Sequence, residues 1–490
     1  MTEELDYERI QHVVKKCFRY VTLSHVWGGK EPSFQDVNLA GSVWELDSSP
    51  LNEKLRQFCE VVRSRGYQWA WSDTCCIDKT NSTVLNQSLT MMYKWYETSS
   101  VTFVHLVDVM SPSALGDLTG SIWMKRAWTA QELLAAKAIR FYTRDWKPYL
   151  GDTRADHKKS PKIMQELADA IGIARTTIIA FNPDDLTVRE KLRLASTRNA
   201  TVEEDVAYSL IGLFKSDIIP RYGEGDAALG HLLEETVARL GEVTVLAWSG
   251  ESSTYNSCLP AAIAVYRQPP HTLSAIENAK MEAEVSRLRR TLSREEAIQI
   301  YDKITDLPAA QFSNRRLRLP CIIFSVRKLD VQDFGRGREY RYRARVPGIG
   351  NVEFQTLDRL SQTDPHNLIF IHPWIRHLFD PLPGLRRTSM AHGDDDNDEG
   401  RSSSSGDRGS PASTPSIPES NIEPLTIMDD YTHTLKIVAR LQHPFHALLL
   451  QQQSSGEFKR VAAEHEIIVP GIEPKFSFVR DFRAAVVDVL

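Results

Sequence analysis

Residues 18–29 read FRYVTLSHVWGG, and this stretch sets the expected fold of the first part of the chain. Residues 18–24 form a compact apolar run, which polar and aromatic side chains follow directly. Similar short runs occur at residues 69–77, 101–107 and 138–142. None of them alternates cleanly between polar and apolar residues, as is typical of strands buried on both faces of a sheet. We therefore predict four buried strands.

Segments with helical periodicity separate these runs. Apolar residues recur at helical spacing between the first and second runs and between the second and third: Leu51, Leu55, Phe58, Val62, Leu85, Leu89, Met92 and Tyr96. A further helix is expected over residues 123–137. Strands that alternate with helices predict an α/β domain, here a doubly wound parallel sheet at residues 1–150.

The rest of the chain divides into segments that differ in composition and in hydrophobic pattern. Residues 151–240 are predicted to be a helical extension of the first domain. Strand-like runs then follow a charged helical stretch, at residues 320–326, 340–346, 368–372, 435–441, 445–450 and 460–469. They predict a mainly antiparallel, β-rich domain made of residues 241–386 and 425–490. Residues 387–424 are acidic and rich in Ser and Pro with few bulky apolar residues, so they are predicted to be a disordered linker.

Composition narrows the class of protein. A net charge of −5 and a pI near 6.3 give no electrostatic footprint for a nucleic acid partner. The N-terminus is polar and acidic, unlike a secretory signal, and no apolar run reaches the roughly 20 residues of a membrane helix. Six scattered cysteines fit reduced thiols better than a disulfide scaffold. These features predict a cytoplasmic protein without a membrane span.

Polar and aromatic residues gather where the predicted strands end. They are Ser24, His25, Trp27 and Gly28 at the end of the first strand, Asp73, Cys76 and Asp78 where the second strand ends, Asp108 after the third, and Arg126, Trp128 and Glu132 on the helix before the fourth. Ligands of parallel α/β sheets bind beyond the carboxyl ends of the strands. We therefore predict that Ser24, Asp73 and Asp108 share one edge of the sheet, in a ligand pocket.

The same segments carry a set of blocks in a fixed order. They read YVTLSHVWG at residues 20–28, WSDTCCIDK at 71–79, MYKWY at 92–96 and RAWTAQELL at 126–134, with ASTR, EDVAYSL and YGEG following at 195–198, 204–210 and 222–225. This order resembles the HET domain of fungal heterokaryon incompatibility proteins, from residue 18 to about residue 240. The resemblance implies an intracellular effector of incompatibility and programmed cell death.

The resemblance also implies a chemistry. HET domains are thought to be distant relatives of TIR domains, some of which use a glutamate on the helix after the third strand to cleave NAD. Glu132 lies on that predicted helix, so the likeness implies Glu132 as the catalytic residue and NAD as a substrate, with no cofactor. The rival reading is a non-enzymatic signalling module that acts by homo-oligomerisation through the HET domain or by recruiting a protein partner for allorecognition.

Each acidic candidate residue has two possible roles, one functional and one structural. Glu132 either stabilises a ribosyl cation and holds ribose hydroxyls, or caps its helix or pairs with Arg126. Asp73 and Asp78 either bind a ligand or cap the helix that follows them.

The aromatic and sulfur-bearing candidate residues also have two possible roles. Trp27 and Trp128 either stack on a nucleotide base or pack in the core. Cys75 and Cys76, with His25, suggest a metal site or a thiol nucleophile. Neighbours in a strand point to opposite faces, however, so the two sulfurs are not expected to share a site, and no metal ligand set is assigned.

Overall fold

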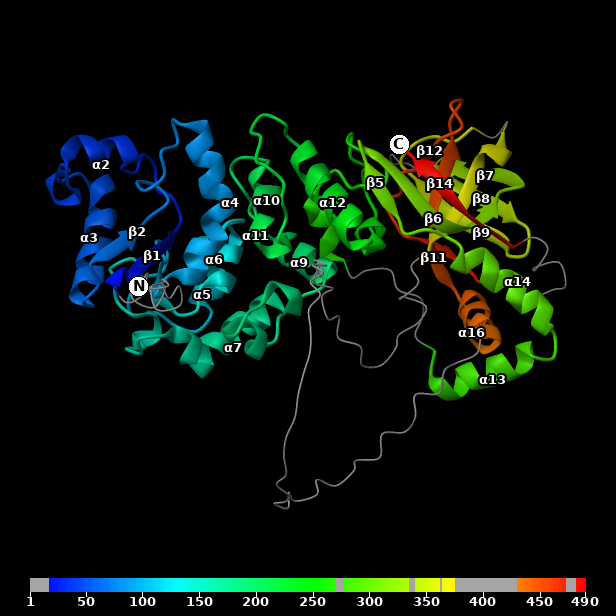
Figure 1. The fold of residues 1–490 in the computed structure, drawn as a ribbon, viewed down its shortest axis with the longest axis horizontal. Helices are drawn as coiled ribbons and strands as arrows, with labels where there is room; N and C mark the ends of the chain where they lie inside the picture. The colour runs from blue at the N-terminus through cyan, green and yellow to red at the C-terminus, as the bar shows by residue number, and fades with distance from the viewer. Residues whose placement is uncertain (1–16, 269–275, 335–339, 362–363, 375–429, 473–481) are drawn as a thin grey trace, which may run out of the picture.

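The computed structural model describes residues 17–268, 276–334, 340–361, 364–374, 430–472 and 482–490. An N-terminal α/β unit, a middle group of helices and a C-terminal β-rich unit follow one another in a row (Figure 1). This arrangement confirms the predicted α/β class and the β-rich C-terminal part. The predicted linker at residues 387–424 lies outside the described residues, and the domain boundaries stay predictions.

Parallel strands build the N-terminal sheet. Within the described residues it has four strands in the order β2-β1-β3-β4, namely β1 (Tyr20–His25), β2 (Trp69–Trp71), β3 (Val101–His105) and β4 (Ile139–Tyr142). All three pairings are parallel, as predicted. The helices of this unit are α2 (Phe34–Ala40), α3 (Pro50–Ser64), α4 (Ser82–Thr98), α5 (Asp117–Gly120) and α6 (Thr129–Ala135).

Side-chain alternation along β1 divides the core into two layers. Val21 and Leu23 pack against Phe58 of α3 on one face of the sheet. Thr22 and Ser24 point to the opposite face, because successive side chains of a strand lie on opposite sides. There the Thr22 hydroxyl is hydrogen-bonded to the Thr102 hydroxyl at 2.8 Å, and Ser24 reaches α6. The sheet is therefore covered on both faces.

Two predicted elements of the N-terminal unit differ from the structure. The second strand was expected over residues 69–77 but ends at Trp71, because the backbone N–H of Cys76 donates to the carbonyl of Ser72 at 2.9 Å and closes a turn. The helix expected over residues 123–137 is broken. A 3-10 helix (Ile122–Lys125) precedes α6, and Arg126 between them has an extended backbone.

The middle group of helices packs on the N-terminal unit through a glycine. Its helices are α7 (Pro161–Ile171), α8 (Arg175–Ile179), α9 (Val188–Ala195), α10 (Asp205–Tyr208), α11 (Ile211–Phe214) and α12 (Ala227–Leu240). Gly212 of α11 lies against Tyr93 of α4. A Cβ atom at Gly212 would stand 2.2 Å from the Cβ atom of Tyr93, far inside van der Waals contact.

Gly212→Ala is therefore expected to destabilise the protein by about 1–3 kcal/mol, because it overpacks the contact between α11 and α4. Urea denaturation followed by circular dichroism would measure the loss. Gly120→Ala in α5 is the matched control, since a Cβ atom there meets nothing within 4 Å. Equal stability of the two variants would contradict the close approach of the two helices.

The C-terminal unit combines helices with mainly antiparallel sheets. Its elements are α13 (Asn278–Leu288), α14 (Arg294–Thr305), β5 (Gln311–Ser313), β6 (Arg316–Ser325), β7 (Lys328–Phe334), β8 (Tyr340–Val346), β9 (Gly350–Thr356), β10 (Leu368–Pro373), α16 (Asp430–Leu441), β11 (Phe445–Gln452), β12 (Phe458–Arg460), β13 (Ile467–Val469) and β14 (Arg483–Val489). In the described parts of the chain, one sheet has the order β10-β11-β12-β14-β6-β5, with β10 also paired to β6 and β13 to β11. In this sheet the pairing of β12 with β14 is parallel. A second sheet has the order β7-β8-β9.

One predicted strand of this unit is a helix. Residues 435–441 belong to α16, which packs against α13 and α14. Leu435, Val438 and Leu441 recur every third residue and are all buried, which is a helical pattern rather than an alternating one.

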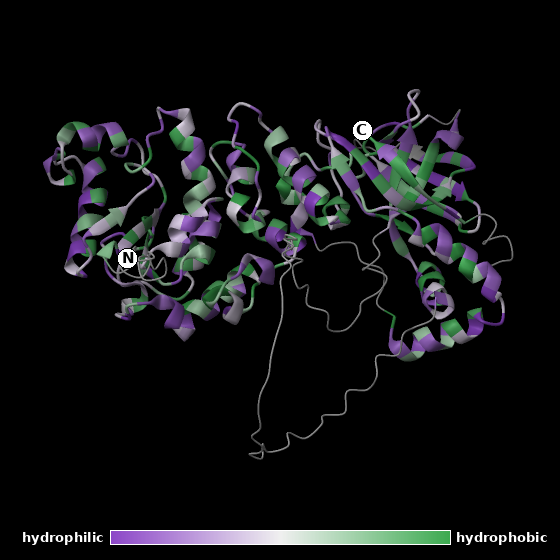
Figure 2. Cartoon of the chain, in the orientation of Figure 1, coloured by the Kyte–Doolittle hydropathy of each residue, from purple (hydrophilic) through white to green (hydrophobic). Residues whose placement is uncertain are grey.

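The distribution of hydrophobic residues along the chain agrees with this packing. Figure 2 shows hydrophobic residues concentrated in the strands of the C-terminal unit, while α13 and α14 mix hydrophobic and hydrophilic residues along their length. Among the residues that the structure describes, no helix has both the length and the apolar character needed to cross a membrane.

Candidate functional site

The carboxyl end of β1 meets the first turn of α6 through a buried hydrogen-bond chain. The Ser24 hydroxyl donates to Oε2 of Glu132 and accepts from the indole N–H of Trp123 at 2.8 Å. The tyrosine hydroxyl of Tyr96 donates to the carbonyl of Leu23 at 2.9 Å beside this chain. Glu132 is thus held by a hydroxyl whose own orientation is fixed by an indole.

Burial controls the charge of Glu132, whose exposed fraction is 5%. Burial raises the pKa of Glu132 to about 8. The hydrogen bond from Ser24 and the charges of Arg126 and Arg198 lower this pKa, whereas the negative charge of Asp73 raises it. A pKa of about 8 means that the carboxyl is mostly protonated at neutral pH, as in catalytic acids tuned by burial.

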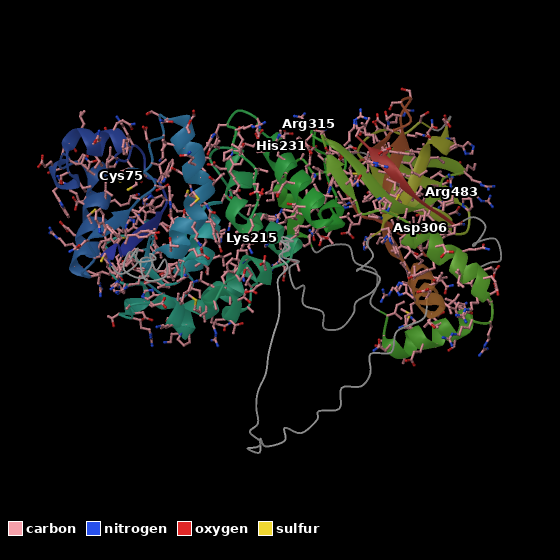
Figure 3. The ribbon with its side chains drawn as sticks, viewed as in Figure 1. Cys75, Lys215, His231, Asp306, Arg315 and Arg483 are labelled. Carbon is pink, nitrogen blue, oxygen red and sulfur yellow. The ribbon has the colours of Figure 1, made fainter. Side chains whose placement is uncertain are left out.

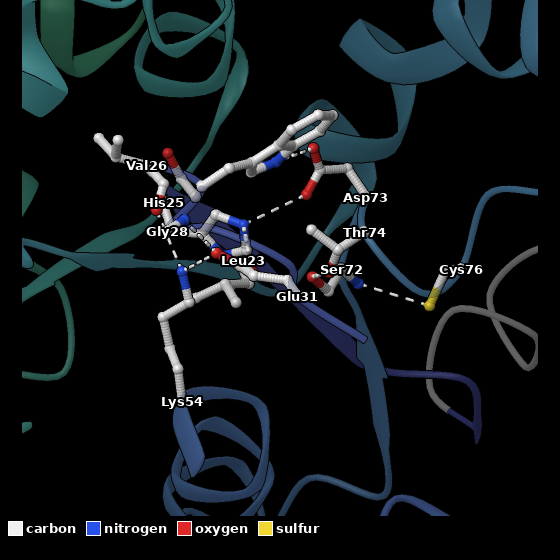
Figure 4. Close-up of polar contacts among 12 residues, drawn as sticks. Leu23, His25, Val26, Gly28, Glu31, Lys54, Ser72, Asp73, Thr74 and Cys76 are labelled. Atoms are coloured by element: carbon white, nitrogen blue, oxygen red, sulfur yellow. Dashed lines mark hydrogen bonds and ion pairs between the residues drawn. The ribbon is translucent and has the colours of Figure 1, made fainter. Parts of the chain in front are cut away.

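His25, the last residue of β1, lies between two carboxylates. Its Nε2 atom is 3.5 Å from Oε2 of Glu31 and 3.6 Å from Oδ1 of Asp73. Figure 4 shows the imidazole facing these two side chains. Burial, followed by the positive charges of Lys54 and His105, holds the pKa of His25 well below its usual range. The imidazole is therefore neutral at physiological pH.

Glu31 and Lys54 fasten the loop that follows β1. Oε1 of Glu31 accepts a hydrogen bond from the backbone N–H of Gly28 at 2.7 Å and pairs with Lys54. The Lys54 ammonium also donates to the carbonyl of Val26 at 3.0 Å (Figure 4). Neither residue was among the predicted site residues.

The outer rim of the site is formed by Trp27, Asp73 and Lys79. The Trp27 indole N–H donates to Oδ2 of Asp73 at 2.9 Å, and the Lys79 ammonium lies 3.8 Å from the centroid of the Trp27 ring. Trp27 is 46% exposed, so the core reading of this tryptophan is wrong. Burial raises the pKa of Asp73, although Lys79 and the Trp27 indole lower it.

The remaining predicted residues have other contacts. Asp78 accepts hydrogen bonds from Gln35 at 2.6 Å and from the hydroxyl of Thr80 at 2.6 Å, while Asn81 caps the following helix. Arg126 donates to the Thr201 hydroxyl at 3.3 Å.

Trp128, Asp108 and Cys76 also have separate surroundings. Trp128 is partly buried and packs against the core, as its structural reading expected. Asp108 lies beyond β3 at the predicted edge, but it accepts from the hydroxyl of Ser121 at 2.6 Å and the N–H of Ile122 at 2.8 Å. Cys76 is exposed.

We call Ser24, His25, Trp27, Asp73 and Glu132 the strand-end cluster, with Gly28 in its loop. Two carboxyl groups, an imidazole, a hydroxyl and an exposed indole meet there at the carboxyl edge of a parallel sheet. A ring for stacking and a tunable carboxyl suit the binding of an aromatic, cationic group. Within the described residues, no group of three or more His, Cys, Asp or Glu is arranged to hold a metal ion.

A separate cavity of about 360 Å³ lies by α12 and β5. Its lining includes Arg221, Glu224, His231, Glu234 and Phe312. Figure 3 shows His231 and Arg315 in this middle region of the molecule, apart from Cys75 in the N-terminal unit. None of these residues belongs to the strand-end cluster.

The fold and the site define a parallel α/β domain with a buried carboxyl behind an aromatic rim. Residues 20–116 match the family model described as heterokaryon incompatibility protein (HET). The N-terminal unit of this chain is accordingly a HET domain, and the expected family is confirmed.

A curated relative gives a more particular comparison. The chain is 32% identical over 227 residues to the vegetative incompatibility protein HET-E-1 of Podospora anserina. The match covers 44% of this chain but only 16% of that relative. No solved structure matches the chain significantly.

Proposed function

We propose that this protein is a cytoplasmic effector of heterokaryon incompatibility whose HET domain cleaves NAD in the manner of some TIR domains. The match of residues 20–116 to the HET family and the name of the relative, a vegetative incompatibility protein, support the biological role. The C-terminal β-rich unit senses, restrains or scaffolds the HET domain in this proposal. Triggering involves a protein partner for allorecognition.

The observation that carries the enzymatic proposal is the buried Glu132 carboxyl, oriented by Ser24 at the carboxyl edge of the sheet. In NAD cleavage, the bond between C1′ of the ribose and the nicotinamide nitrogen breaks, and the bonding electrons leave with nicotinamide. Water then adds to C1′ and loses a proton to solvent. A negative charge at Glu132 would stabilise the ribosyl cation that forms. Trp27 supplies a surface on which a ring of the substrate can stack. The Asp73 carboxylate accepts hydrogen bonds from hydroxyl groups of the substrate.

In this proposal the substrate approaches Glu132 from the side of Trp27, which is 46% exposed, since Glu132 itself is buried and the Asp73 side chain is 18% exposed. A cationic nicotinamide ring beside Glu132 favours the ionised carboxylate, since an opposite charge lowers the pKa of an acid. Substrate binding and deprotonation of Glu132 are therefore coupled in this mechanism.

Incubation of the purified protein with NAD, followed by measurement of nicotinamide, tests this function. Because the pKa of Glu132 in the free protein is about 8, kcat/KM should rise as the pH increases through about 8 and level off above it. Nicotinamide release at the rate of a buffer blank across this range would refute the enzymatic proposal.

The second candidate is a non-enzymatic module that acts by self-association. It is favoured by the exposed aromatic residues at the edge of the N-terminal sheet. Trp69 of the edge strand β2 is 51% exposed, and the Phe18 ring lies 5.8 Å from it. Sheet edges and aromatic surfaces commonly join copies of a protein. Sedimentation that shows only monomers at micromolar concentration would count against this candidate.

A further inference from the structure

Cys75 and Cys76 lie in a turn and not in a strand. Since β2 ends at Trp71, the rule that neighbouring side chains point to opposite faces does not apply to them. The turn is closed by a reciprocal pair of contacts between Ser72 and Cys76: the Cys76 N–H donates to the Ser72 carbonyl at 2.9 Å, and the Ser72 N–H donates to the Cys76 sulfur at 3.5 Å (Figure 4). Within this turn the side chains of Cys75 and Cys76 are hydrogen-bonded to each other, so the two sulfurs lie close together.

The environment of the two thiols differs. Cys76 is exposed, and its sulfur accepts hydrogen bonds from the Cys75 thiol and the Ser72 N–H. The hydrogen bond from Cys75 lowers the pKa of Cys76 to about 7. Cys75 is partly buried, and its role as donor to Cys76, together with burial, raises its pKa. Thiolates, and not thiols, react with electrophiles and oxidants.

We propose that Cys76 is an oxidisable thiol that peroxide converts to a disulfide with Cys75. The Cys76 thiolate attacks one oxygen of hydrogen peroxide, the O–O bond breaks, and the leaving hydroxide takes the proton of the Cys75 thiol to form water. Cys76 is then a sulfenic acid. The Cys75 thiolate attacks the Cys76 sulfur and expels hydroxide, which is protonated by solvent. The two thiols together lose two electrons, and peroxide becomes two waters.

Such a disulfide would be reversible. Adjacent Cα atoms stand about 3.8 Å apart across a trans peptide, whereas Cα atoms joined by a disulfide are usually about 4.4–6.8 Å apart. The bond between neighbours is therefore strained, and strained exposed disulfides are readily reduced. It would also reshape the turn that begins at Asp73 of the strand-end cluster, so oxidation links the redox state to that cluster.

Treatment of the full-length protein with hydrogen peroxide, followed by intact mass and peptide mapping, tests this inference. The expected result is the loss of two hydrogens, mapped to the Cys75–Cys76 peptide and restored by dithiothreitol. Cys75→Ser is expected to stop at the sulfenic acid, which dimedone traps on Cys76. Cys17→Ser, at another exposed cysteine, should leave the oxidation unchanged.

Two results would overturn the inference. One is a Cys76 that neither forms the disulfide nor takes up dimedone in the Cys75→Ser variant under conditions that oxidise free cysteine. The other is a disulfide that maps to Cys59 and Cys76, since Cys59 is also partly buried near this turn. Neither readout involves NAD, so this test is independent of the proposed enzymatic function.

Discussion

Glu132→Gln is expected to remain folded and to release nicotinamide from NAD at about one hundredth of the wild-type rate or less. Glutamine keeps the shape of the side chain, and its amide oxygen can still accept the hydrogen bond from the Ser24 hydroxyl. It cannot carry the negative charge that stabilises a ribosyl cation. Nicotinamide is measured chromatographically at pH 8.5, where wild-type Glu132 is largely ionised, and folding is checked by circular dichroism.

Glu166→Gln is the matched control for this substitution. Glu166 of α7 is also a partly enclosed glutamate, which accepts a hydrogen bond from the N–H of Gly116 at 3.0 Å, but it lies outside the strand-end cluster. Its variant should keep the wild-type rate. In cells, overexpressed Glu132→Gln should neither kill nor deplete NAD. If this variant folds and still kills while NAD stays constant, self-association becomes the better account of the protein.

The sequence predicted those parts of the fold that depend on local pattern. β3 and β4 lie within their predicted runs, because buried parallel strands need short continuous apolar segments. β1 overlaps the run predicted at residues 18–24 but ends one residue beyond it, at His25. The prediction of the second strand was wrong beyond Trp71. A backbone hydrogen bond from Cys76 to Ser72 ends the strand there, and the apolar pattern of the sequence gives no sign of it. The strand predicted at residues 435–441 was wrong for a related reason, because a short apolar run fits a strand or a buried helix equally well.

The candidate site was predictable where topology alone brings residues together. Ser24 lies at the carboxyl end of β1 and Asp73 follows the neighbouring parallel strand β2, so their meeting at one edge follows from the strand order. The ion pair of Glu31 and Lys54 was not predictable, because it joins a loop to the second turn of α3 and neither position has a distinctive spacing. Trp123 was placed in the predicted helix, but its hydrogen bond to Ser24 depends on the 3-10 turn that replaces the start of that helix.

The stability of the protein should fall with rising pH because of Glu132, and Glu132→Gln should remove this dependence. The pKa of Glu132 is about 8 in the folded protein, against about 4.3 in an unfolded chain. Between these values the folded state binds more protons than the unfolded state, so the free energy of unfolding decreases as the pH rises. The slope approaches about 1.4 kcal/mol per pH unit, and the total contribution is on the order of a few kcal/mol.

Comparison of the two proteins by urea denaturation at pH 5, 7 and 9 isolates this contribution, because the other titrating groups are common to both. The stability of Glu132→Gln relative to wild type should increase at each step. Glu204→Gln is the control with the opposite sign. Although burial raises the pKa of Glu204, hydrogen bonds from backbone N–H groups, including Gly223 and Gly225, leave it below its ordinary value. Glu204→Gln should therefore be less stable than wild type by a nearly constant amount over the same pH range. A constant difference for Glu132→Gln as well would mean that Glu132 is ionised in the folded protein, and the pH dependence proposed for NAD cleavage would lose its basis.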